Sequence, residues 1–146
     1  MRAQRIINLS LMVMLLALSQ SFAQKAAPNF KLSTQEGKVV ELVKLKGNIV
    51  VLNFWATWCG PCRKEIPGFM EVYKHYKEKG LEIVGVSLDR DGWEAVGPYV
   101  EQAKINYPVV VGNRAMVEAY GGIDAIPATF IIDKQGNVEE IIKGLL

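Results

Sequence analysis

The stretch NIVVLNFWATWCGPC, residues 48–62, decides the fold of this chain. Its first part, residues 48–55, is a continuous apolar run of the kind that forms a strand buried on both faces of a sheet. Cys59 and Cys62, the only cysteines among the 146 residues, follow almost directly. A disulfide between them would close a very small loop and would add little stability. The pair is therefore predicted to be a reaction centre.

An amphipathic helix is predicted to begin within the same motif. Apolar side chains recur at helical spacing from Pro61 to about Lys79, and Gly80 supplies the stop. Cys59 then lies at the helix N-terminus, where free backbone N–H groups and the helix dipole favour a thiolate. We expect Cys59 to attack a substrate disulfide and Cys62, about one turn further along, to resolve the mixed disulfide. A reducing partner must then regenerate the dithiol.

The rest of the chain is predicted to alternate strands with helices. Strands are expected over residues 81–88 and 108–111, helices over 91–104 and 114–120, and hairpins over 30–42 and 128–143. This order indicates a three-layer α/β domain.

The N-terminal segment reads as a targeting sequence. Arg2 and Arg5 precede an apolar run over residues 6–18, and small residues lead up to Ala23. This pattern is typical of a secretory signal peptide cleaved after Ala23. The alternative is an uncleaved membrane anchor, although the run is shorter than the roughly 20 residues that span a bilayer.

The net charge of the chain changes once the predicted signal peptide is set aside. The chain is predicted to divide into a signal peptide, residues 1–23, and one domain, residues 24–146. The whole chain has 17 Lys and Arg and 15 Asp and Glu, and the signal peptide holds two of the basic residues and no acid. The domain is therefore neutral, with 15 residues of each sign. Nucleic acid is excluded as a partner, and a membrane is expected only if the N-terminal segment stays uncleaved.

Two motifs carry a resemblance to a known family. Residues 54–62, FWATWCGPC, resemble the active site of the thioredoxin superfamily, and residues 126–130, IPATF, resemble its second signature. The resemblance implies a thioredoxin-like α/β/α sandwich with a cis peptide bond before Pro127, although only about one such bond in 20 is otherwise cis. It also implies that the backbone of Ile126 pairs with the bound substrate chain. The substrate groove would be formed by Trp58, Gly60, Pro61, Ile126 and Pro127.

The distance between the two motifs points to one branch of that superfamily. The chain has room for an extra strand and helix between them, and this insertion, the N-terminal hairpin and the predicted export are similar to the TlpA-like and ResA-like branch. The branch implies an exported reductase of protein disulfides, in the bacterial periplasm or at the outer face of the cytoplasmic membrane. A membrane or periplasmic thiol reductant would supply its electrons, and cytochrome c maturation is one setting. General disulfide oxidation or isomerisation would use the same residues.

Two polar positions near the cysteines distinguish this chain. Many thioredoxins have a buried acid six residues before the first cysteine, where this chain has Asn53. Glu65, three residues after Cys62, matches an acid that the ResA-like branch carries, and we expect it to be catalytic. A partly buried carboxylate there would have a raised pKa and, once ionised, would keep the thiol pKa values high. The alternative is an exposed acid that complements the helix dipole.

Other site chemistries fit the sequence less well. A metal site needs about four ligands, which two cysteines and the distant His75 cannot supply, so we expect no metal and no cofactor beyond the cysteine pair. A peroxiredoxin-like thiol peroxidase is an alternative function. That family has a proline and a threonine just upstream of its reactive cysteine. Here Thr57 lies only two residues before Cys59, and Phe54 or Trp55 occupies the proline position.

The end of the sequence departs from the thioredoxin pattern. Thioredoxin folds close with a helix after the last hairpin, whereas this sequence ends at residues 143–146, where that helix should start. Either the sequence is a fragment, or a partner covers the exposed apolar face of the sheet, or the domain is less stable than its relatives. If the sequence is complete, we expect self-association or aggregation.

Overall fold

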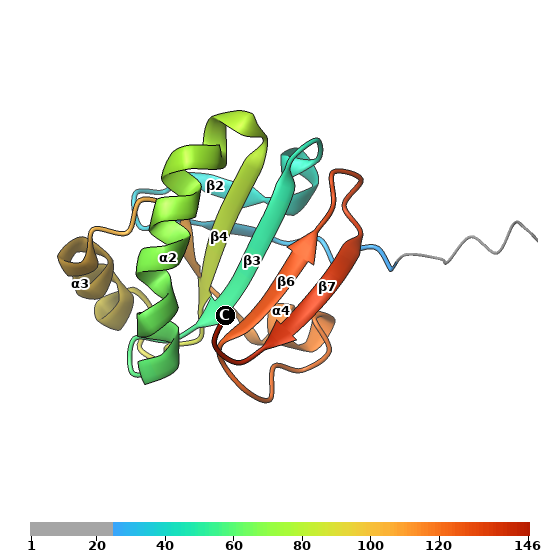
Figure 1. The fold of residues 1–146 in the computed structure, drawn as a ribbon. Helices are drawn as coiled ribbons and strands as arrows, with labels where there is room; N and C mark the ends of the chain where they lie inside the picture. Colours follow the sequence, from blue (N-terminus) through green and yellow to red (C-terminus); the bar gives the residue numbers. More distant parts are fainter. Residues whose placement is uncertain (1–24) are drawn as a thin grey trace, which may run out of the picture.

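A five-stranded sheet forms the centre of the computed structural model, which describes residues 25–146 (Figure 1). The predicted signal peptide lies outside the described residues. The strand order is β5-β4-β3-β6-β7. The strands are β3 (Ile49–Trp55), β4 (Leu81–Ser87), β5 (Val109–Val111), β6 (Ala128–Ile132) and β7 (Val138–Lys143). All five lie within one or two residues of the predicted positions.

The direction of the strands follows from their connections. β3, β4 and β5 run parallel, because each connection crosses over the sheet. β6 returns antiparallel to β3 and continues through a tight turn into β7. The central strand β3 is buried on both faces from Val50 to Trp55, which is why its sequence is apolar at every position except Asn53.

Within residues 25–146, three α-helices flank the sheet. The helix α2 (Gly60–Tyr76) continues as a short 3-10 turn, η2 (Lys77–Lys79), and ends at Gly80 in the left-handed conformation with φ 90°. The inserted helix α3 (Trp93–Ala103) and the short α4 (Arg114–Ala119) confirm the two later helix predictions. An N-terminal hairpin of β1 (Lys31–Ser33) and β2 (Val39–Glu41) leads into the 3-10 turn η1 (Leu42–Leu45).

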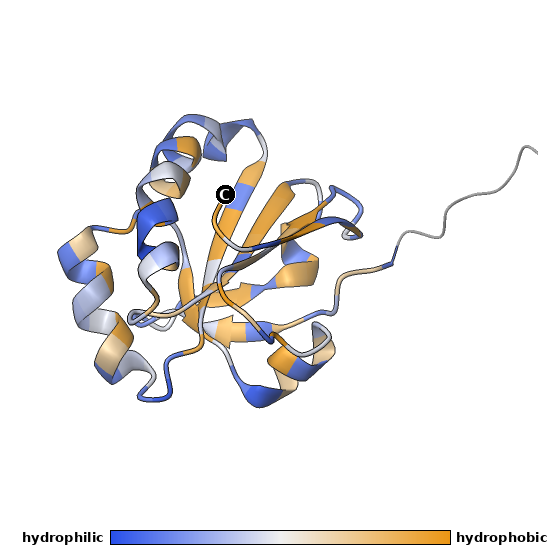
Figure 2. Cartoon of the chain, turned by 60° about the horizontal axis from the view of Figure 1, so that its bottom comes forward, coloured by the Kyte–Doolittle hydropathy of each residue, from blue (hydrophilic) through white to orange (hydrophobic). Residues whose placement is uncertain are grey.

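Alternate side chains of β3 divide the core into two layers. Val51 and Trp55 face α2 and α3, whereas Leu52 and Phe54 face the hairpin and α4. Figure 2 shows the sheet as the most hydrophobic part of the chain, with mixed polarity along the helices. The order helix, sheet, helix confirms the predicted three-layer thioredoxin-like fold.

One part of the sheet has no helix over it. On the side where α2 lies, no helix within residues 25–146 lies over β6 and β7 (Figure 1). Instead residues 144–146 turn back toward the centre of the sheet, where the Gly144 N–H donates to the Pro127 carbonyl at 2.8 Å. In the same part of the chain, no helix combines the length and the hydrophobicity that crossing a bilayer requires.

The packing beneath α3 depends on a glycine in β4. A Cβ atom on Gly85 would lie 3.1 Å from the Trp55 indole nitrogen and 3.2 Å from the Tyr107 ring. We expect Gly85→Ala to lower the free energy of unfolding by about 1–3 kcal/mol through overpacking. Urea unfolding followed by tryptophan fluorescence measures this effect.

A second glycine serves as the control for that substitution. Gly68, on the exposed side of α2, has open space at its Cβ position. Gly68→Ala is expected to raise the free energy of unfolding by about 0.5–1 kcal/mol, because alanine favours a helix. Equal stability of the Gly85→Ala variant and the unchanged protein would contradict the packing argument.

Candidate active site

The cysteine pair lies where β3 passes into α2. Cys59 is the N-cap of the helix and forms a disulfide with Cys62, with 5.3 Å between their Cα atoms. The Cys62 N–H donates to Cys59 Sγ at 3.3 Å. Gly60 and Pro61 fill the first turn, where the missing N–H of proline costs no hydrogen bond. The sulfur of Cys59 is thus held against backbone donors at the positive end of the helix dipole.

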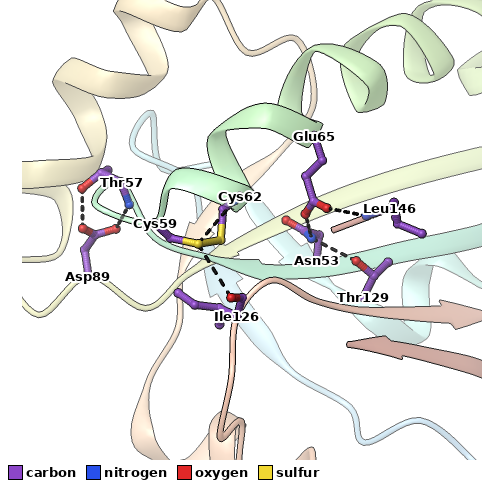
Figure 3. The surroundings of a disulfide bond; sticks show 9 residues. All are labelled: Asn53, Thr57, Cys59, Cys62, Glu65, Asp89, Ile126, Thr129 and Leu146. Carbon is purple, nitrogen blue, oxygen red and sulfur yellow. Dashed lines mark hydrogen bonds between the residues drawn. A yellow bond between two sulfur atoms is a disulfide. The ribbon is translucent and has the colours of Figure 1, made fainter. Parts of the chain in front are cut away.

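The cis-proline loop reaches the cysteines although it lies more than sixty residues further along the chain. The Ile126–Pro127 bond is cis, as predicted. The antiparallel register of β3 and β6 pairs Phe54 with Ala128, and this pairing brings the residues before Ala128 beside the end of β3. The Ile126 carbonyl oxygen lies 3.8 Å from Cys59 Sγ (Figure 3). The structure therefore brings both predicted motifs together.

The surface around the pair is partly apolar. Trp58 is 69 % exposed, directly before the buried Cys59, and Gly60 and Pro61 are also exposed. Pro127 is buried and Ile126 half-buried. An exposed indole beside a reactive sulfur offers a flat apolar surface to an approaching chain.

A buried polar network lies on the α2 side of the sheet. Asn53 on β3 donates through Nδ2 to Glu65 Oε1 at 2.7 Å and to Thr129 Oγ1 at 3.0 Å. The Leu146 N–H donates to the other Glu65 oxygen at 3.4 Å. Figure 3 shows these groups next to the disulfide, with Glu65 pointing down from α2 toward Asn53. Glu65 is only 7 % exposed, so it is not the exposed acid of the alternative interpretation.

Burial determines the acidity of this carboxyl group. Burial raises the pKa of Glu65 above 4.5, and the hydrogen bonds from Asn53 and from the Leu146 backbone partly oppose the rise. The pKa of Tyr107 is also raised, first by burial and then by the negative charge of Glu65. A carboxyl group with a raised pKa exchanges protons closer to neutral pH, which suits proton transfer with a thiol.

A second buried carboxylate was not predicted from the sequence. Asp89, just after β4, accepts from the Thr57 N–H at 2.9 Å, from Thr57 Oγ1 at 2.6 Å and from Ser87 Oγ at 2.7 Å. The pairing of Trp55 with Ser87 brings the ends of β3 and β4 together. The sequence did contain a signal for Asp89, because this acid directly follows the predicted buried strand over residues 81–88. The carboxyl ends of parallel strands meet at one edge of a sheet, so an acid there lies near the end of the neighbouring strand.

The described residues contain no candidate metal site. No group of three or more His, Cys, Asp or Glu side chains comes close enough to bind a metal ion within residues 25–146. The Cys59–Cys62 pair forms a disulfide, and such a pair can exchange two electrons with another disulfide.

The fold and the site together define a class of protein. A cysteine pair at the start of the helix after the central strand, beside a cis-proline loop, is the arrangement of thiol-disulfide oxidoreductases in the thioredoxin superfamily. Comparison with protein-family models gives the family: the AhpC/TSA family matches residues 23–141, and the chain belongs to it.

Curated relatives carry the name of an enzyme of this class. "Thiol-disulfide oxidoreductase ResA" from Bacillus anthracis is 44% identical over 120 residues, which cover 82% of this chain and 69% of the relative. The protein of the same name from Bacillus subtilis (strain 168) is 41% identical over 121 residues, covering 82% of this chain and 66% of the relative. The present chain is likewise a thiol-disulfide oxidoreductase.

Solved structures agree with this fold. A putative thiol:disulfide interchange protein DsbE from Chlorobium tepidum superposes with a TM-score of 0.78 at 32% identity, covering 84% of this chain and 86% of its own. StoA from Bacillus subtilis superposes with a TM-score of 0.71 at 27% identity, and the match covers 82% of this chain and 90% of the StoA chain. The inserted strand and helix therefore belong to a fold shared with other thiol-disulfide proteins.

The raised pKa of Glu65 predicts how stability changes with pH. Because its folded-state pKa lies above the unfolded value, Glu65 contributes stability below about pH 4.5, and this contribution is lost as the pH rises through the folded-state pKa. Glu65→Gln stays neutral throughout. We therefore expect the variant to gain stability relative to the unchanged protein between pH 4 and pH 8, measured by urea unfolding.

An exposed acid provides the control for this measurement. Glu101→Gln on α3 removes a carboxylate that faces solvent. Its stability difference from the unchanged protein should vary little over the same pH range. A constant difference for Glu65→Gln as well would show that burial does not perturb Glu65.

Proposed function

We propose that this thiol-disulfide oxidoreductase is exported and works as a reductase of protein disulfides, with Cys59 as the attacking residue and Cys62 as the resolving one. The observation that carries the proposal is the difference in access between the two sulfurs. Cys59 is 5% exposed beside the exposed Trp58, whereas Cys62 is 0% exposed. A substrate disulfide can therefore reach only Cys59.

The reaction starts from the dithiol. The Cys59 thiolate, stabilised by the helix N-terminus and by the Cys62 N–H, attacks one sulfur of the substrate disulfide. A mixed disulfide forms, and the other substrate sulfur leaves as a thiolate that takes up a proton. Cys62 then loses its proton and attacks Cys59 Sγ. The second substrate sulfur leaves as a thiolate and takes up a proton. The substrate disulfide has gained two electrons from the Cys59 and Cys62 thiols, which are oxidised to the Cys59–Cys62 disulfide.

The groove for the substrate is built around Cys59. Trp58, Gly60 and Pro61 supply one side, and Ile126 and Pro127 supply the other. Because Pro127 has no N–H, the backbone of Ile126 is the group that would pair with an extended substrate chain. The exposure of Trp58 and the 3.8 Å from Cys59 Sγ to the Ile126 carbonyl support this arrangement.

Glu65 is proposed as the catalytic acid and base for the buried thiol. Cys62 and Glu65 are three residues apart on α2, so their side chains project from the same face of the helix. Asn53 cannot exchange a proton but donates a hydrogen bond that holds one Glu65 oxygen. In this chain the buried acid thus comes from the helix rather than from the strand. It would accept the Cys62 proton during resolution.

The proposed direction of the reaction and its cellular setting are supported by the N-terminal sequence and by the resemblance to the ResA-like branch. Export through residues 1–23 would deliver the domain to an oxidising compartment, the periplasm or the outer face of the cytoplasmic membrane, where a reductase keeps chosen cysteines free. A membrane or periplasmic thiol reductant would return the disulfide to the dithiol. The resemblance to the ResA-like branch makes the haem-binding cysteines of apocytochromes the proposed substrates, in cytochrome c maturation.

A peroxidase function has less support from the site. In a peroxidase of this kind, the threonine upstream of the reactive cysteine, here Thr57, would have to offer its hydroxyl group to the peroxide. In this chain the Thr57 hydroxyl already donates to Asp89 at 2.6 Å. The geometry at this position favours disulfide exchange.

Trapping the intermediate tests the roles of the two cysteines. In the Cys62→Ser variant the mixed disulfide cannot be resolved, so substrate proteins should remain bound to Cys59. Incubation of the reduced variant with an exported-protein extract, followed by non-reducing electrophoresis and mass spectrometry, identifies them. Cys59→Ser is the matched control and should trap nothing. An empty Cys62→Ser sample, or equal trapping by both variants, would reject the assignment.

Thiol titration tests the role of Glu65. Removing the carboxylate with Glu65→Gln removes a negative charge next to the cysteines, so the pKa of the reactive thiol should fall by about one unit. Alkylation rates of the dithiol between pH 5 and pH 10 measure this change. Glu101→Gln again serves as the control, and an unchanged thiol pKa in Glu65→Gln would remove Glu65 from the mechanism.

A further inference from the structure

Asp89 is a buried charged group that the proposed mechanism does not use. Its side chain is only 7% exposed, and every side-chain hydrogen bond described above has the carboxylate as acceptor. Two of the three donors belong to a single residue, Thr57, and the third is Ser87 Oγ. The Asp89 N–H in turn donates to Ser87 Oγ at 3.0 Å. An ionised carboxylate, which accepts only, fits this set of donors.

The residue held by Asp89 belongs to the turn that carries Cys59. The Cys59 N–H donates to the Ala56 carbonyl at 3.1 Å, so residues 56–59 form a tight turn between β3 and α2. Thr57 is inside this turn and is bound through both its N–H and its hydroxyl group. Figure 3 shows Asp89 and Glu65 on opposite sides of the disulfide. The Asp89 carboxylate therefore holds the backbone of residues 56–59, which sets the position of Cys59 Sγ.

We propose that Asp89 is a positioning residue for Cys59: it fixes the turn through Thr57, and its negative charge disfavours the Cys59 thiolate and so keeps the cysteine pair strongly reducing. The proposal rests on Cys59 as the attacking residue. It adds a second carboxylate, from the inserted part of the fold, whose effect on the redox equilibrium is separate from proton transfer by Glu65.

The distance allows the charge of Asp89 to act on Cys59. One carboxylate oxygen lies 2.9 Å from the Thr57 nitrogen. Two residues of chain reach at most roughly 7 Å, so the Cys59 backbone nitrogen lies within about 10 Å of the carboxylate and Cys59 Sγ within about 13 Å. Partly buried charges at that distance are screened less than exposed ones.

Other charged groups near the cysteines come from α2 and from the loop after Asp89. Glu65 lies on the opposite side of the pair, and the Arg63 guanidinium lies over the Tyr99 ring at 5.6 Å. Arg90 and Asp91 follow in the chain and are exposed. Asp91 thus offers an acid of the same charge, close in sequence but without the contacts to the turn.

Equilibration with glutathione tests the charge. The balanced reaction converts the protein disulfide and two glutathione thiols into the protein dithiol and glutathione disulfide. Asp89→Asn keeps an oxygen for the Thr57 N–H but removes the charge, so the Cys59 pKa should fall by about half a unit to one unit. At a pH above the Cys59 pKa, where the reduced form carries the thiolate, the equilibrium constant for reduction should then rise about threefold to tenfold. Asp91→Asn, the matched control, should change it less than twofold.

Amide exchange tests the positioning. Asp89→Ala removes the acceptor as well as the charge, and hydrogen exchange at residues 57–59 should become about tenfold faster than in Asp89→Asn. If Asp89→Ala does not fold, Thr57→Val removes the hydroxyl bond and keeps the charge. It should accelerate the same amides several-fold while leaving the glutathione equilibrium within about twofold of the unchanged protein.

The outcomes separate this proposal from the proposed function. An equilibrium constant in Asp89→Asn equal to that of the unchanged protein or of Asp91→Asn overturns the role of the charge. Unchanged exchange at residues 57–59 in Asp89→Ala, or in Thr57→Val, overturns the positioning. Neither the glutathione equilibrium nor the amide exchange involves a protein substrate. Failure of Cys62→Ser to trap a substrate would therefore reject the reductase assignment without deciding the role of Asp89.

Discussion

The antiparallel pairing of β6 with β3 is the contact on which the site depends. It sets Ala128 opposite Phe54, so the cis-proline loop arrives beside Cys59 at the end of the central strand. A slip of one residue would turn every side chain of β6 to the other face. Thr129 would then leave Asn53, and the Ile126 carbonyl would leave the sulfur. The register of one strand pair thus holds together segments from distant parts of the sequence.

Two carboxylates flank the cysteine pair, and they differ in what surrounds them. Glu65 projects from α2 into the sheet, where burial raises its pKa and Asn53 holds one oxygen. Asp89 follows the parallel strand β4 and is satisfied by three donors at the edge of the sheet. The strand position that holds an acid in many thioredoxins is the neutral amide Asn53 here, and the buried carboxyl group that contacts it comes from the helix α2.

The inserted unit also has a structural part in this arrangement. Gly85 lies beneath Trp55 and Tyr107, and Gly97 lets the Gln35 side chain approach α3 more closely than a Cβ atom would allow. The turn of the N-terminal hairpin therefore reaches α3, whereas the apolar side chains of the hairpin cover the face of the sheet opposite to the cysteines. The loop that contains Asp89 joins β4 to α3, and its hydrogen bonds with Thr57 link this connection to the turn before Cys59.

The sequence by itself determined the strands, the helices and the cysteine pair. The apolar run before Cys59, the helical spacing after Pro61 and the glycine stops act over short distances, so they could be interpreted without a structure. Two familiar motifs also predicted the cis bond at Pro127. Only the tertiary structure decided that Glu65 is buried against Asn53 and that Asp89 binds Thr57. Those contacts join residues far apart in the chain, and they depend on strand order and register, which the packing of the whole domain sets.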